Sequence, residues 1–503
     1  MKALEKDKER TIERKEVVGE VVSKVVQEAV QEKAKCIIGL ETHIQLDTKT
    51  KLFCSCPTKL LQGKTDFPNS RCCPICLGHP GSKPMLNRQV LNFALKLCTA
   101  LGCQIEKEIA FSRKTYFYPD LSKNFQITQF EIPLGKNGSV KLKSGKVVEI
   151  QRIHMEEDPA ALVHEGSMQE SPYVLIDYNR SGIPLCEIVT TPCMTSPAEA
   201  REFLKELIKI VKYLHIFDEN SGVLKADLNI SIPGHPRVEI KNVSGFKDAE
   251  LALNYELVRQ KIALKTGKEV FLHTRAWDGK KTFLLRTKET EDDYGYIIEP
   301  DLPQITVSEK MQEQVKKEVP ELAHVRSARY LREMKIDPTD AEIMAAELEL
   351  AELFERVAKK VNPSLTAKWL RRELLRVLNY NQKSLRQIQL NEMHLIELLQ
   401  LIEKEEISER VGQKLMEQLI EKDFSPKEYV QKEGLRKVSG EEEIRKACEK
   451  VVKEYQKAVD DYLAGNEKSL HFLIGQVMRL TQGKAAPDVV MKVMKKISHR
   501  KIL

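Results

Sequence analysis

The sequence predicts an α+β protein in which a mainly antiparallel sheet, over residues 36–306, forms a cradle that helical domains follow. Two observations predict the sheet. Residues 37–46 and 227–241 alternate between apolar and polar side chains, which is typical of strands with one buried face. A third observation predicts the helices, because the chain becomes rich in Leu, Glu, Lys and Arg from about Val307.

Composition and charge are those of a globular protein in water. Charged residues make up 31% of the chain, and no apolar run approaches the roughly 20 residues that a membrane-spanning helix needs. The first 35 residues interleave acids with bases, unlike a signal or transit peptide, and we expect a solvated helical extension that activity does not require. Eleven cysteines, several of them single among apolar residues, are typical of buried thiols in a reducing cytoplasm.

The first predicted strand, residues 37–46, carries Glu41 and His43 on its polar face. Residues two apart on a strand are separated by about 7 Å, so this carboxylate and this imidazole could both reach one ion. The alternative is a sheet edge whose polar residues are solvated.

Four cysteines follow in two closely spaced pairs, Cys54 with Cys56 and Cys73 with Cys76. C-x-C and C-x-x-C pairs, across a loop with prolines and glycines, can supply four thiolates to a tetrahedral zinc ion. Because four sulfur ligands leave no open coordination position, such a zinc ion would be structural. The alternative is a set of free thiols.

The segment from Ser112 to Gln126 interleaves bases with aromatic residues, among them Lys114 and Tyr116. This mixture suits contacts to phosphates and stacking on bases. Aromatic residues of this kind also anchor hydrophobic cores, so the pattern by itself leaves both roles open.

Two later stretches place acids on predicted strands. Residues 153–158 contain Glu156 and Glu157, and on a regular strand only one of two adjacent carboxylates can face an ion. A solvated acidic loop is the alternative for this stretch. Glu187 lies among apolar residues, so we expect its carboxylate to be partly buried and to need a base or a cation as its partner.

A helix and a hairpin complete the predicted sheet region. Ser196-Pro197-Ala198-Glu199 is a capping box with proline at the first helical position, and it opens a helix with one apolar face. Residues 227–241 form a hairpin whose two arms both alternate. Asp227 lies on the polar face of the first arm, and Glu239 and Lys241 share one face of the second.

The helical half divides between Pro426 and Gly440, and its final helices are expected at 472–480 and 489–497. From Arg479 onward the bases outnumber the acids, which is typical of either a solvated helix face or a contact to a phosphate backbone. The expected parts are an extension, a cradle domain, a helical domain and a tail: 1–35, 36–306, 307–430 and 431–503.

Six motifs, in one order along the chain, resemble a known family. They are Gly39-Leu40-Glu41-Thr42-His43, Cys73-Pro74-Ile75-Cys76-Leu77-Gly78, Tyr116-Phe117-Tyr118-Pro119-Asp120, His154-Met155-Glu156-Glu157-Asp158, Asp177-Tyr178-Asn179-Arg180-Ser181-Gly182-Ile183-Pro184-Leu185 and Val238-Glu239-Ile240-Lys241-Asn242. Over residues 36–497 the chain resembles the GatB/GatE family of tRNA-dependent amidotransferase subunits. The resemblance implies a cradle similar to the glutamine synthetase fold and a YqeY-like tail that binds tRNA.

The family's activity is that of a ligase in protein biosynthesis, which amidates misacylated Glu-tRNA(Gln), Asp-tRNA(Asn) or both. ATP phosphorylates the side-chain carboxylate, and ammonia then displaces phosphate. The resemblance further implies a heterotrimer, in which GatA is the amidase that supplies ammonia and GatC braces the pair. The chain has no G-x-x-x-x-G-K-[ST] loop, so its nucleotide would be held by metals, lysines and arginines.

Site residues are implied where this sequence matches a family motif. They are Glu41, His43, Glu187 and either Glu156 or Glu157 for Mg²⁺, Lys114 and Tyr116 for phosphate or substrate, and Asp227, Glu239 and Lys241 for the nucleotide. The sequence departs from the family pattern at Lys225, where arginine is common, and a lysine cannot grip a phosphate bidentately.

Three other functions stay open at this point. One is the archaeal GatE-type subunit specific for glutamine, although GatE carries a large insertion for which this chain is too short. Another is a tRNA-binding assembly factor without catalysis. The third is an ammonia ligase that acts on a small free acid.

Overall fold

The computed structural model describes residues 35–60, 65–164, 171–218, 224–287, 294–436, 441–481, 485 and 487–500. The predicted N-terminal extension lies almost wholly outside these residues and stays a prediction. The chain divides into two compact units, Met1–Pro320 and Glu321–Leu503. In the described parts, none of the helices combines the length and the apolar character needed to cross a membrane.

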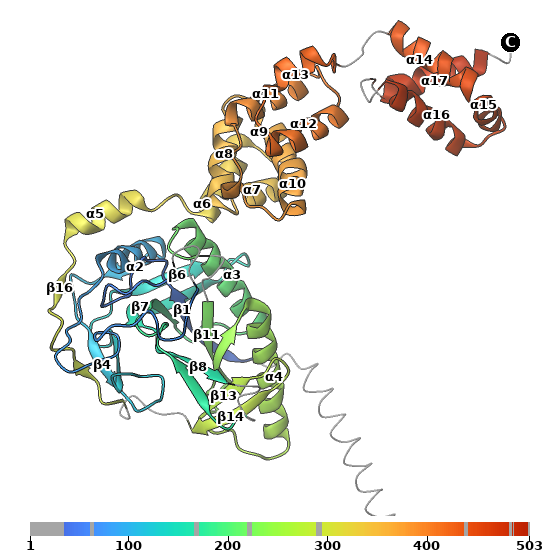
Figure 1. The fold of residues 1–503 in the computed structure, drawn as a ribbon. Helices are drawn as coiled ribbons and strands as arrows, with labels where there is room; N and C mark the ends of the chain where they lie inside the picture. Colours follow the sequence, from blue (N-terminus) through green and yellow to red (C-terminus); the bar gives the residue numbers. More distant parts are fainter. Residues whose placement is uncertain are drawn as a thin grey trace, which may run out of the picture. The chain divides into compact units, whose positions relative to one another are not determined.

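The first unit is built on a sheet of nine strands (Figure 1), and every neighbouring pair is antiparallel except β12 with β13. In order across the sheet the strands are β14 (Thr282–Thr287), β13 (His273–Trp277), β12 (Val238–Ser244), β11 (Leu224–Ser231), β1 (Ile37–Gln45), β10 (Pro184–Thr190), β7 (Val147–Glu157), β6 (Gly135–Lys141) and β2 (Gln104–Ile105). The predicted mixture of helices and a largely antiparallel sheet is confirmed, and so is the hairpin, as β11 and β12.

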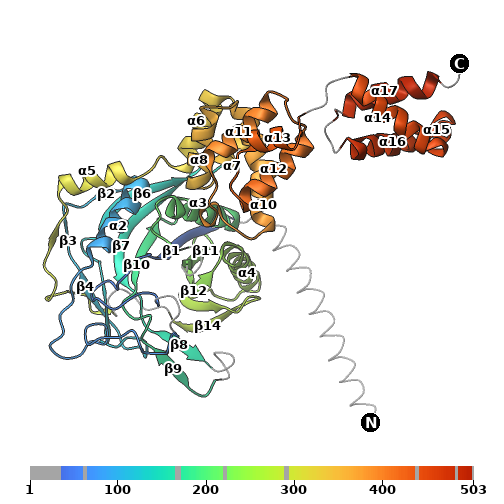
Figure 2. The same ribbon diagram turned by 45° about the horizontal axis from the view of Figure 1, so that its top comes forward.

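Helices α2 (Arg88–Ala100), α3 (Pro197–Tyr213) and α4 (Phe246–Lys265) pack on one face of this sheet, as Figures 1 and 2 show. They cover that face because alternate strand residues there are apolar and fully buried, for example Leu40 on β1 and Ile188 on β10. The polar residues of the same strands therefore lie on the opposite face.

Local signals in the sequence explain where α3 begins. The Ser196 side chain accepts a hydrogen bond from the Glu199 N–H, and proline occupies the first turn, as predicted. The other half of the predicted capping box differs, because the Glu199 carboxylate accepts from the Thr195 N–H at 2.7 Å rather than from that of Ser196. At the end of the first unit, α5 (Glu309–Glu318) packs against α2, and its Val315 joins the same core. The first unit thus runs to Pro320 rather than ending at the predicted boundary at 306.

Three small sheets accompany the large one. The first consists of β15 (Ile297–Ile298), β4 (Ser112–Thr115) and β5 (Phe125–Thr128), the second of β16 (Ile305–Thr306) and β3 (Glu108–Ile109), and the third of β8 (Ala161–His164) and β9 (Val174–Asp177). Strand β5 packs beside the end of β7, so it lies next to the acidic residues there.

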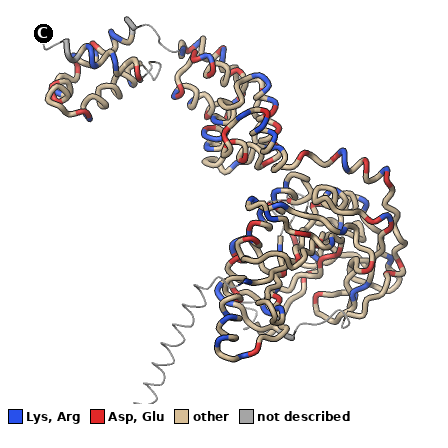
Figure 3. Tube along the Cα trace, turned by 180° about the vertical axis from the view of Figure 1, so that it is seen from behind, with Lys and Arg blue, Asp and Glu red and all other residues tan. Residues whose placement is uncertain are grey.

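The second unit is helical among the residues that the structure describes, as predicted. Its helices are α6 (Ala323–Arg329), α7 (Pro338–Met344), α8 (Leu348–Ala358), α9 (Pro363–Trp369), α10 (Leu375–Tyr380), α11 (Glu392–Glu403), α12 (Glu409–Glu421), α13 (Pro426–Lys432), α14 (Glu441–Glu454), α15 (Gln456–Leu463), α16 (Glu467–Leu480) and α17 (Pro487–Arg500). One core lies among α7 to α13 and includes Val430, and a separate core lies among α14 to α17. Acidic and basic residues are interspersed along these helices (Figure 3).

Candidate active site and metal centres

The polar face of the large sheet brings residues from five strands together. The strand register places His43 on β1 opposite Glu187 on β10, and Glu187 opposite His154 on β7. On the other side of β1, Glu41 lies opposite Asp227 of β11. These residues are neighbours because the antiparallel strands are adjacent and side chains two apart share a face.

The first acidic group consists of His43, Glu156 and Glu187. Their ligand atoms all lie within 4.8 Å of one another. Nε2 of His43 lies 3.4 Å from a carboxylate oxygen of Glu156 and 3.4 Å from one of Glu187. Two carboxylates and an imidazole at this spacing can close around one divalent cation, and the oxygen ligands suit Mg²⁺.

The second acidic group consists of Glu41, Asp227 and Glu239, whose ligand atoms also lie within 4.8 Å of one another. A lysine occupies this group, since Nζ of Lys241 lies 2.6 Å from Asp227 and 3.4 Å from Glu239. Glu41 therefore gathers with Asp227 rather than with His43. This differs from the predicted single set because the two β1 residues face different neighbouring strands.

The adjacent pair Glu156 and Glu157 divides between the two sides of β7. Glu156 joins His43, whereas Glu157 is paired with Lys123 and accepts a hydrogen bond of 2.9 Å from the Ile127 N–H. Glu157 is therefore not part of the first acidic group. Its carboxylate instead holds the neighbouring strand β5 against the end of β7.

Burial and charge set the protonation of the first acidic group. Burial lowers the pKa of His43, but the hydrogen bond and charge of Glu187, together with Glu156, outweigh it and raise this pKa to about 10. Burial raises the pKa of Glu187, but the charges and hydrogen bonds of His154 and His43 outweigh burial and hold this pKa well below the ordinary value. For Glu156, burial and the charge of Glu187 raise the pKa. The group therefore favours a bound positive charge, whether a proton or a metal ion.

In the second acidic group, the ammonium of Lys241 is the positive charge that the carboxylates hold. Burial lowers the pKa of Lys241, but Asp227, Glu239 and Glu41 outweigh it and raise the pKa well above the ordinary value. The pKa of Glu41 is raised by burial and by the charge of Glu187, which belongs to the first group. The two groups are thus close enough to influence each other.

Lys114 and Tyr116, both singled out in the sequence, lie close enough to Glu156 to interact with it electrostatically. The charge of Lys114 acts to lower the pKa of Glu156. Burial raises the pKa of Tyr116, and the charges of Asp120 and Glu156 add to this effect. Nζ of Lys114 lies 4.6 Å from the ring centroid of Tyr294, which packs edge-to-face on Tyr116. An aromatic and cationic wall therefore adjoins the acids.

His154 also belongs to this site, although it is not among the predicted site residues. It is buried, and its Nε2 lies 3.2 Å from Glu187 and 3.9 Å from Glu156. Its Nδ1 has no hydrogen-bond partner among the described residues. The signal was present in the sequence, since His154 and Glu156 are two residues apart on a strand, as Glu41 and His43 are.

The four cysteines of the two pairs come together, as predicted. The sulfur atoms of Cys54, Cys56, Cys73 and Cys76 lie within 4.8 Å of one another, and those of Cys73 and Cys76 are 3.9 Å apart. Zinc–sulfur bonds of about 2.3 Å in a tetrahedron separate the sulfurs by about 3.8 Å, so this group fits zinc. A hydrogen bond from the Cys54 thiol and one from the Cys73 N–H lower the pKa of Cys76 to about 4, against the effect of burial.

The basic residues predicted at the end of the chain are only partly described. Lys492, Lys495 and Lys496 are exposed on α17, whereas Lys484 and Lys501 lie outside the described residues. Arg479, at the end of α16, is also exposed.

Comparisons with known proteins agree over most of the chain. Residues 36–313 match the family described as the GatB/GatE catalytic domain, and residues 352–497 match a GatB domain. A relative from Thermotoga neapolitana is 40% identical over 476 residues, which cover 92% of this chain and 98% of the relative. A relative from Methanothermobacter thermautotrophicus is 42% identical over 461 residues, with 91% and 99% covered. Both carry the name of the B-type subunit of aspartyl/glutamyl-tRNA(Asn/Gln) amidotransferase.

Proposed function

The chain belongs to the GatB/GatE family, and from that premise we propose that it catalyses the ATP-dependent amidation of misacylated tRNA. A carboxylate oxygen of the glutamyl or aspartyl group attacks the γ-phosphorus of ATP, ADP leaves, and an acyl phosphate forms. Ammonia then attacks the acyl carbon, phosphate leaves with that oxygen, and the nitrogen loses a proton. Activation is needed because a carboxylate would otherwise have to expel oxide.

One observation carries the proposal. The two acidic groups lie on the same face of the sheet, and a lysine, Lys241, forms an ion pair within the second group. Acids alone would repel a triphosphate, so they serve this reaction only when cations accompany them. Mg²⁺ held by His43, Glu156 and Glu187 would neutralise charge on the phosphate oxygens.

The protein's own side chains then have distinct roles. Lys114 and Lys241 would contact phosphate oxygens, each from beside one acidic group. Asp227 and Glu239 hold the Lys241 ammonium, and Glu41 joins them on the nucleotide side. Tyr116, whose hydroxyl is within electrostatic reach of Glu156, would line the approach of the aminoacyl end.

Ammonia would come from another subunit. Cys186, the cysteine nearest to the acids in sequence, is fully buried, and burial together with the charge of Glu156 raises its pKa, so it is a poor nucleophile for glutamine. We therefore assign glutamine hydrolysis to a GatA-type amidase, with GatC as the third subunit of a heterotrimer. The helical second unit, which contains the matched GatB domain, would bind the tRNA.

The likeness of the cradle to the glutamine synthetase fold remains a prediction, and so does structural zinc. The closed set of four sulfurs supports zinc in a structural role, because it leaves no coordination position for a substrate.

The experiment is an amidation assay with the reconstituted subunits, ATP, Mg²⁺ and either Glu-tRNA(Gln) or Asp-tRNA(Asn). We expect Glu156→Gln to lower the amidation rate by about 100-fold or more, while glutamine hydrolysis by the partner persists. Glu149→Gln, which changes an exposed acid of the same strand β7, is the matched control and keeps the wild-type rate.

Each alternative gives its own result in this assay. Wild-type amidation by the Glu156→Gln variant would contradict the assignment of the site. ADP formation with free glutamate or aspartate in place of the tRNA would indicate a small-acid ligase. Absence of ATP cleavage with every substrate would indicate an assembly factor, and amidation of Glu-tRNA(Gln) alone would favour a GatE-type specificity.

A further inference from the structure

The four-cysteine group adjoins a lysine that the proposed reaction does not use. Lys51 is completely buried, with 0% of its surface exposed. Its Nζ lies 3.7 Å from the Cys76 sulfur and 3.3 Å from the Tyr178 carbonyl oxygen. None of the carboxylates in the described part of the chain forms an ion pair with it. A buried ammonium is unfavourable unless an anion accompanies it, so its counter-charge must come from the cysteine group.

Zinc on four thiolates supplies such a counter-charge, because the set carries a net charge of minus two. We propose that Lys51 is a positioning residue of this zinc site, whose ammonium offsets part of that charge and connects the metal centre to the turn that precedes β10. The proposal rests on the zinc occupancy inferred above. Groups outside the ligand shell commonly affect metal affinity by 10–100-fold when they are removed.

The hydrogen bonds of Lys51 support this role, because they join this residue to both cysteine pairs. Its N–H donates to the Cys56 carbonyl oxygen at 3.0 Å, while its side chain reaches Cys76 of the other pair. The next residue, Leu52, donates its N–H to the Gly182 carbonyl oxygen at 2.9 Å. One short segment therefore contacts the first cysteine pair, the second pair and the turn.

That turn, residues 178–183, packs directly on the cysteine group. The Ser181 hydroxyl donates to the Cys76 carbonyl oxygen at 3.1 Å. Gly182 has φ of +84°, and a Cβ added there would lie 3.5 Å from the Cys76 Cβ and 3.5 Å from the Lys51 Cδ. A larger residue would therefore be strained by its backbone conformation, and its side chain would be confined between these two neighbours.

The same turn is bonded to the end of β7, where the acids lie. The Gly182 N–H donates to the Asp158 carbonyl oxygen at 2.9 Å, and the Asp158 N–H donates to the Ile183 carbonyl oxygen at 2.8 Å. Asp158 follows Glu156 and Glu157, and the turn leads into β10 with Glu187. Lys51 and the metal thus fix the strand ends from which the first acidic group is built.

The test compares zinc retention by the full chain as Lys51→Met, Lys51→Arg and Lys83→Met. Lys83 is the matched control, because it follows the second cysteine pair closely but its side chain is 77% exposed. Zinc loss to a chromophoric chelator is timed at fixed pH, with the wild-type chain alongside. We expect Lys51→Met to lose zinc 10–100-fold faster, Lys51→Arg to recover most of the retention because it keeps the charge, and Lys83→Met to match the wild type.

A second measurement tests whether Lys51 connects the metal centre to the turn before β10 and to that strand. Amide hydrogen exchange over residues 181–190 should be faster in zinc-loaded Lys51→Met than in the wild type, and similar to that of the chelator-treated wild type. Unchanged zinc retention by Lys51→Met would overturn the proposal. So would a Lys51→Arg chain that loses zinc as fast as Lys51→Met, because packing rather than charge would then decide.

Two further results are distinguishable from these. A wild-type chain that binds no zinc would refute the zinc site itself. If Lys51→Met does not fold, the cobalt(II)-loaded Lys51→Arg and Lys51→Gln chains decide. Because Lys51→Arg keeps the charge, its thiolate-to-metal absorption band should match that of the wild type, whereas the band of Lys51→Gln, which removes the charge but not the polarity, should be shifted; an unshifted Lys51→Gln band would overturn the proposal.

Discussion

Lys241 determines the charge balance of the second acidic group. Its ammonium lies between Asp227 and Glu239, and Glu41 completes the group. Replacing Lys241 with methionine keeps much of the side-chain volume but leaves three carboxylates to repel one another. We expect the free energy of unfolding to fall by about 2 kcal/mol in Mg²⁺-free buffer. This is less than the roughly 3–5 kcal/mol for a fully buried pair, because the Lys241 side chain is 31% exposed.

Millimolar Mg²⁺ should restore part of the free energy of unfolding that Lys241→Met loses, because a divalent cation can take the place of the ammonium among the carboxylates. The measurement is urea unfolding of the full chain with and without Mg²⁺. Lys209→Met is the control, since Lys209 forms an ion pair within helix α3 with Glu206 and lies away from the acids. An equal response to Mg²⁺ in both variants would contradict this account.

The sequence predicted the side of the sheet for each of these residues, but not the partners across strands. A period of two correctly places Glu41 and His43 on the polar face. It contains no information on register, and it is register that pairs Glu41 with Asp227 and His43 with Glu187. Which of Glu156 and Glu157 joins His43 also depends on tertiary contacts, because Glu157 forms an ion pair with Lys123 and accepts a hydrogen bond from β5.

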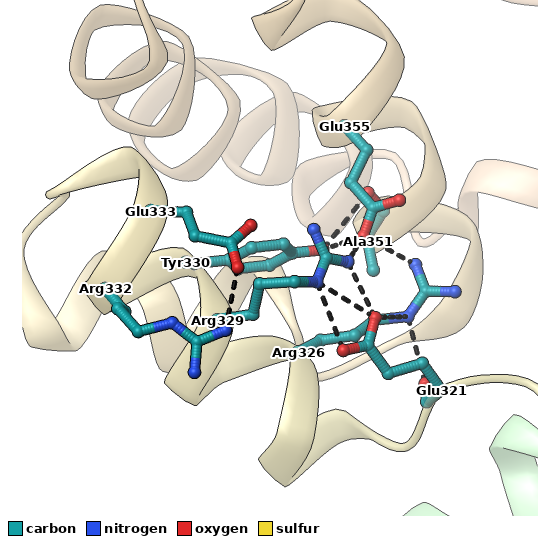
Figure 4. A network of polar contacts seen from close by, with 8 residues as sticks. All are labelled: Glu321, Arg326, Arg329, Tyr330, Arg332, Glu333, Ala351 and Glu355. Carbon is teal, nitrogen blue, oxygen red and sulfur yellow. Dashed lines mark hydrogen bonds and ion pairs between the residues drawn. The ribbon is translucent and has the colours of Figure 1, made fainter.

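At the scale of elements, helix α6 begins at a network of ion pairs (Figure 4). Glu321 lies just before this helix and contacts Arg329 at 2.7 Å, and Glu355 of α8 contacts both Arg326 and Arg329. Tyr330 donates to Glu355 at 2.8 Å. The network holds the first turns of the second unit onto α8.

Glu321→Gln should weaken this attachment in a pH-dependent way. The hydrogen bond from Arg329 lowers the pKa of Glu321 below its ordinary 4.5. A lowered folded-state pKa stabilises the protein above 4.5, and this contribution is lost as the pH falls through the folded-state value. We expect a loss of about 1 kcal/mol at pH 7, because the pair is partly solvated, and a difference that shrinks toward zero as the pH falls through the folded-state pKa.

Hydrogen exchange of residues 323–334 in the full chain measures this effect. Glu333→Gln is the matched control, because Glu333 lies in the same segment but its ion pair with Arg332 is exposed. We expect the amides of this control to exchange at the wild-type rate at both pH 7 and pH 3. A Glu321→Gln difference that stays constant from pH 7 to pH 3 would show that the carboxylate charge is not responsible.

Elements with strong local signals were predictable, and elements fixed by long-range packing were not. The N-cap at Ser196 and the hairpin arms around Gly234 depend on neighbours in sequence, and both are present. Helix α5 looks like the helices that follow it, so the sequence assigned it to the helical domain. Its place is decided by Val315, which packs in the core of the first unit through contacts with α2.

At the scale of the whole molecule, the chain contains three separate hydrophobic cores among its described residues. The largest belongs to the sheet and supports the two acidic groups, and the other two belong to the helices. Composition alone could not define their limits, because helices that share Leu, Glu, Lys and Arg can belong to either helical core. The break in the predicted helices between Pro426 and Gly440 was the usable signal, and α13 ends within it.

In the proposed function, the helical second unit binds the tRNA, and the basic residues of its last core are the candidates for contacts to the phosphate backbone. On helix α17, Lys495 and Lys496 are exposed, whereas Val493 and Met494 are buried in the last hydrophobic core. Changing both lysines to glutamine should therefore leave the core intact and remove two positive charges. If both contact phosphates, fewer counterions are released on binding, and the slope of log K against log salt should become shallower by about 2.

Filter binding of the reconstituted complex to tRNA across a range of salt concentrations measures that slope. The control is Lys316→Gln with Lys317→Gln, an adjacent exposed pair near the end of α5, which should keep the wild-type slope. The loss of affinity should be equal for tRNA(Gln) and tRNA(Asn), because phosphate contacts do not read sequence. A slope unchanged from the wild type would instead make the α17 lysines an ordinary solvated helix face, and tRNA binding would have to be assigned to other residues.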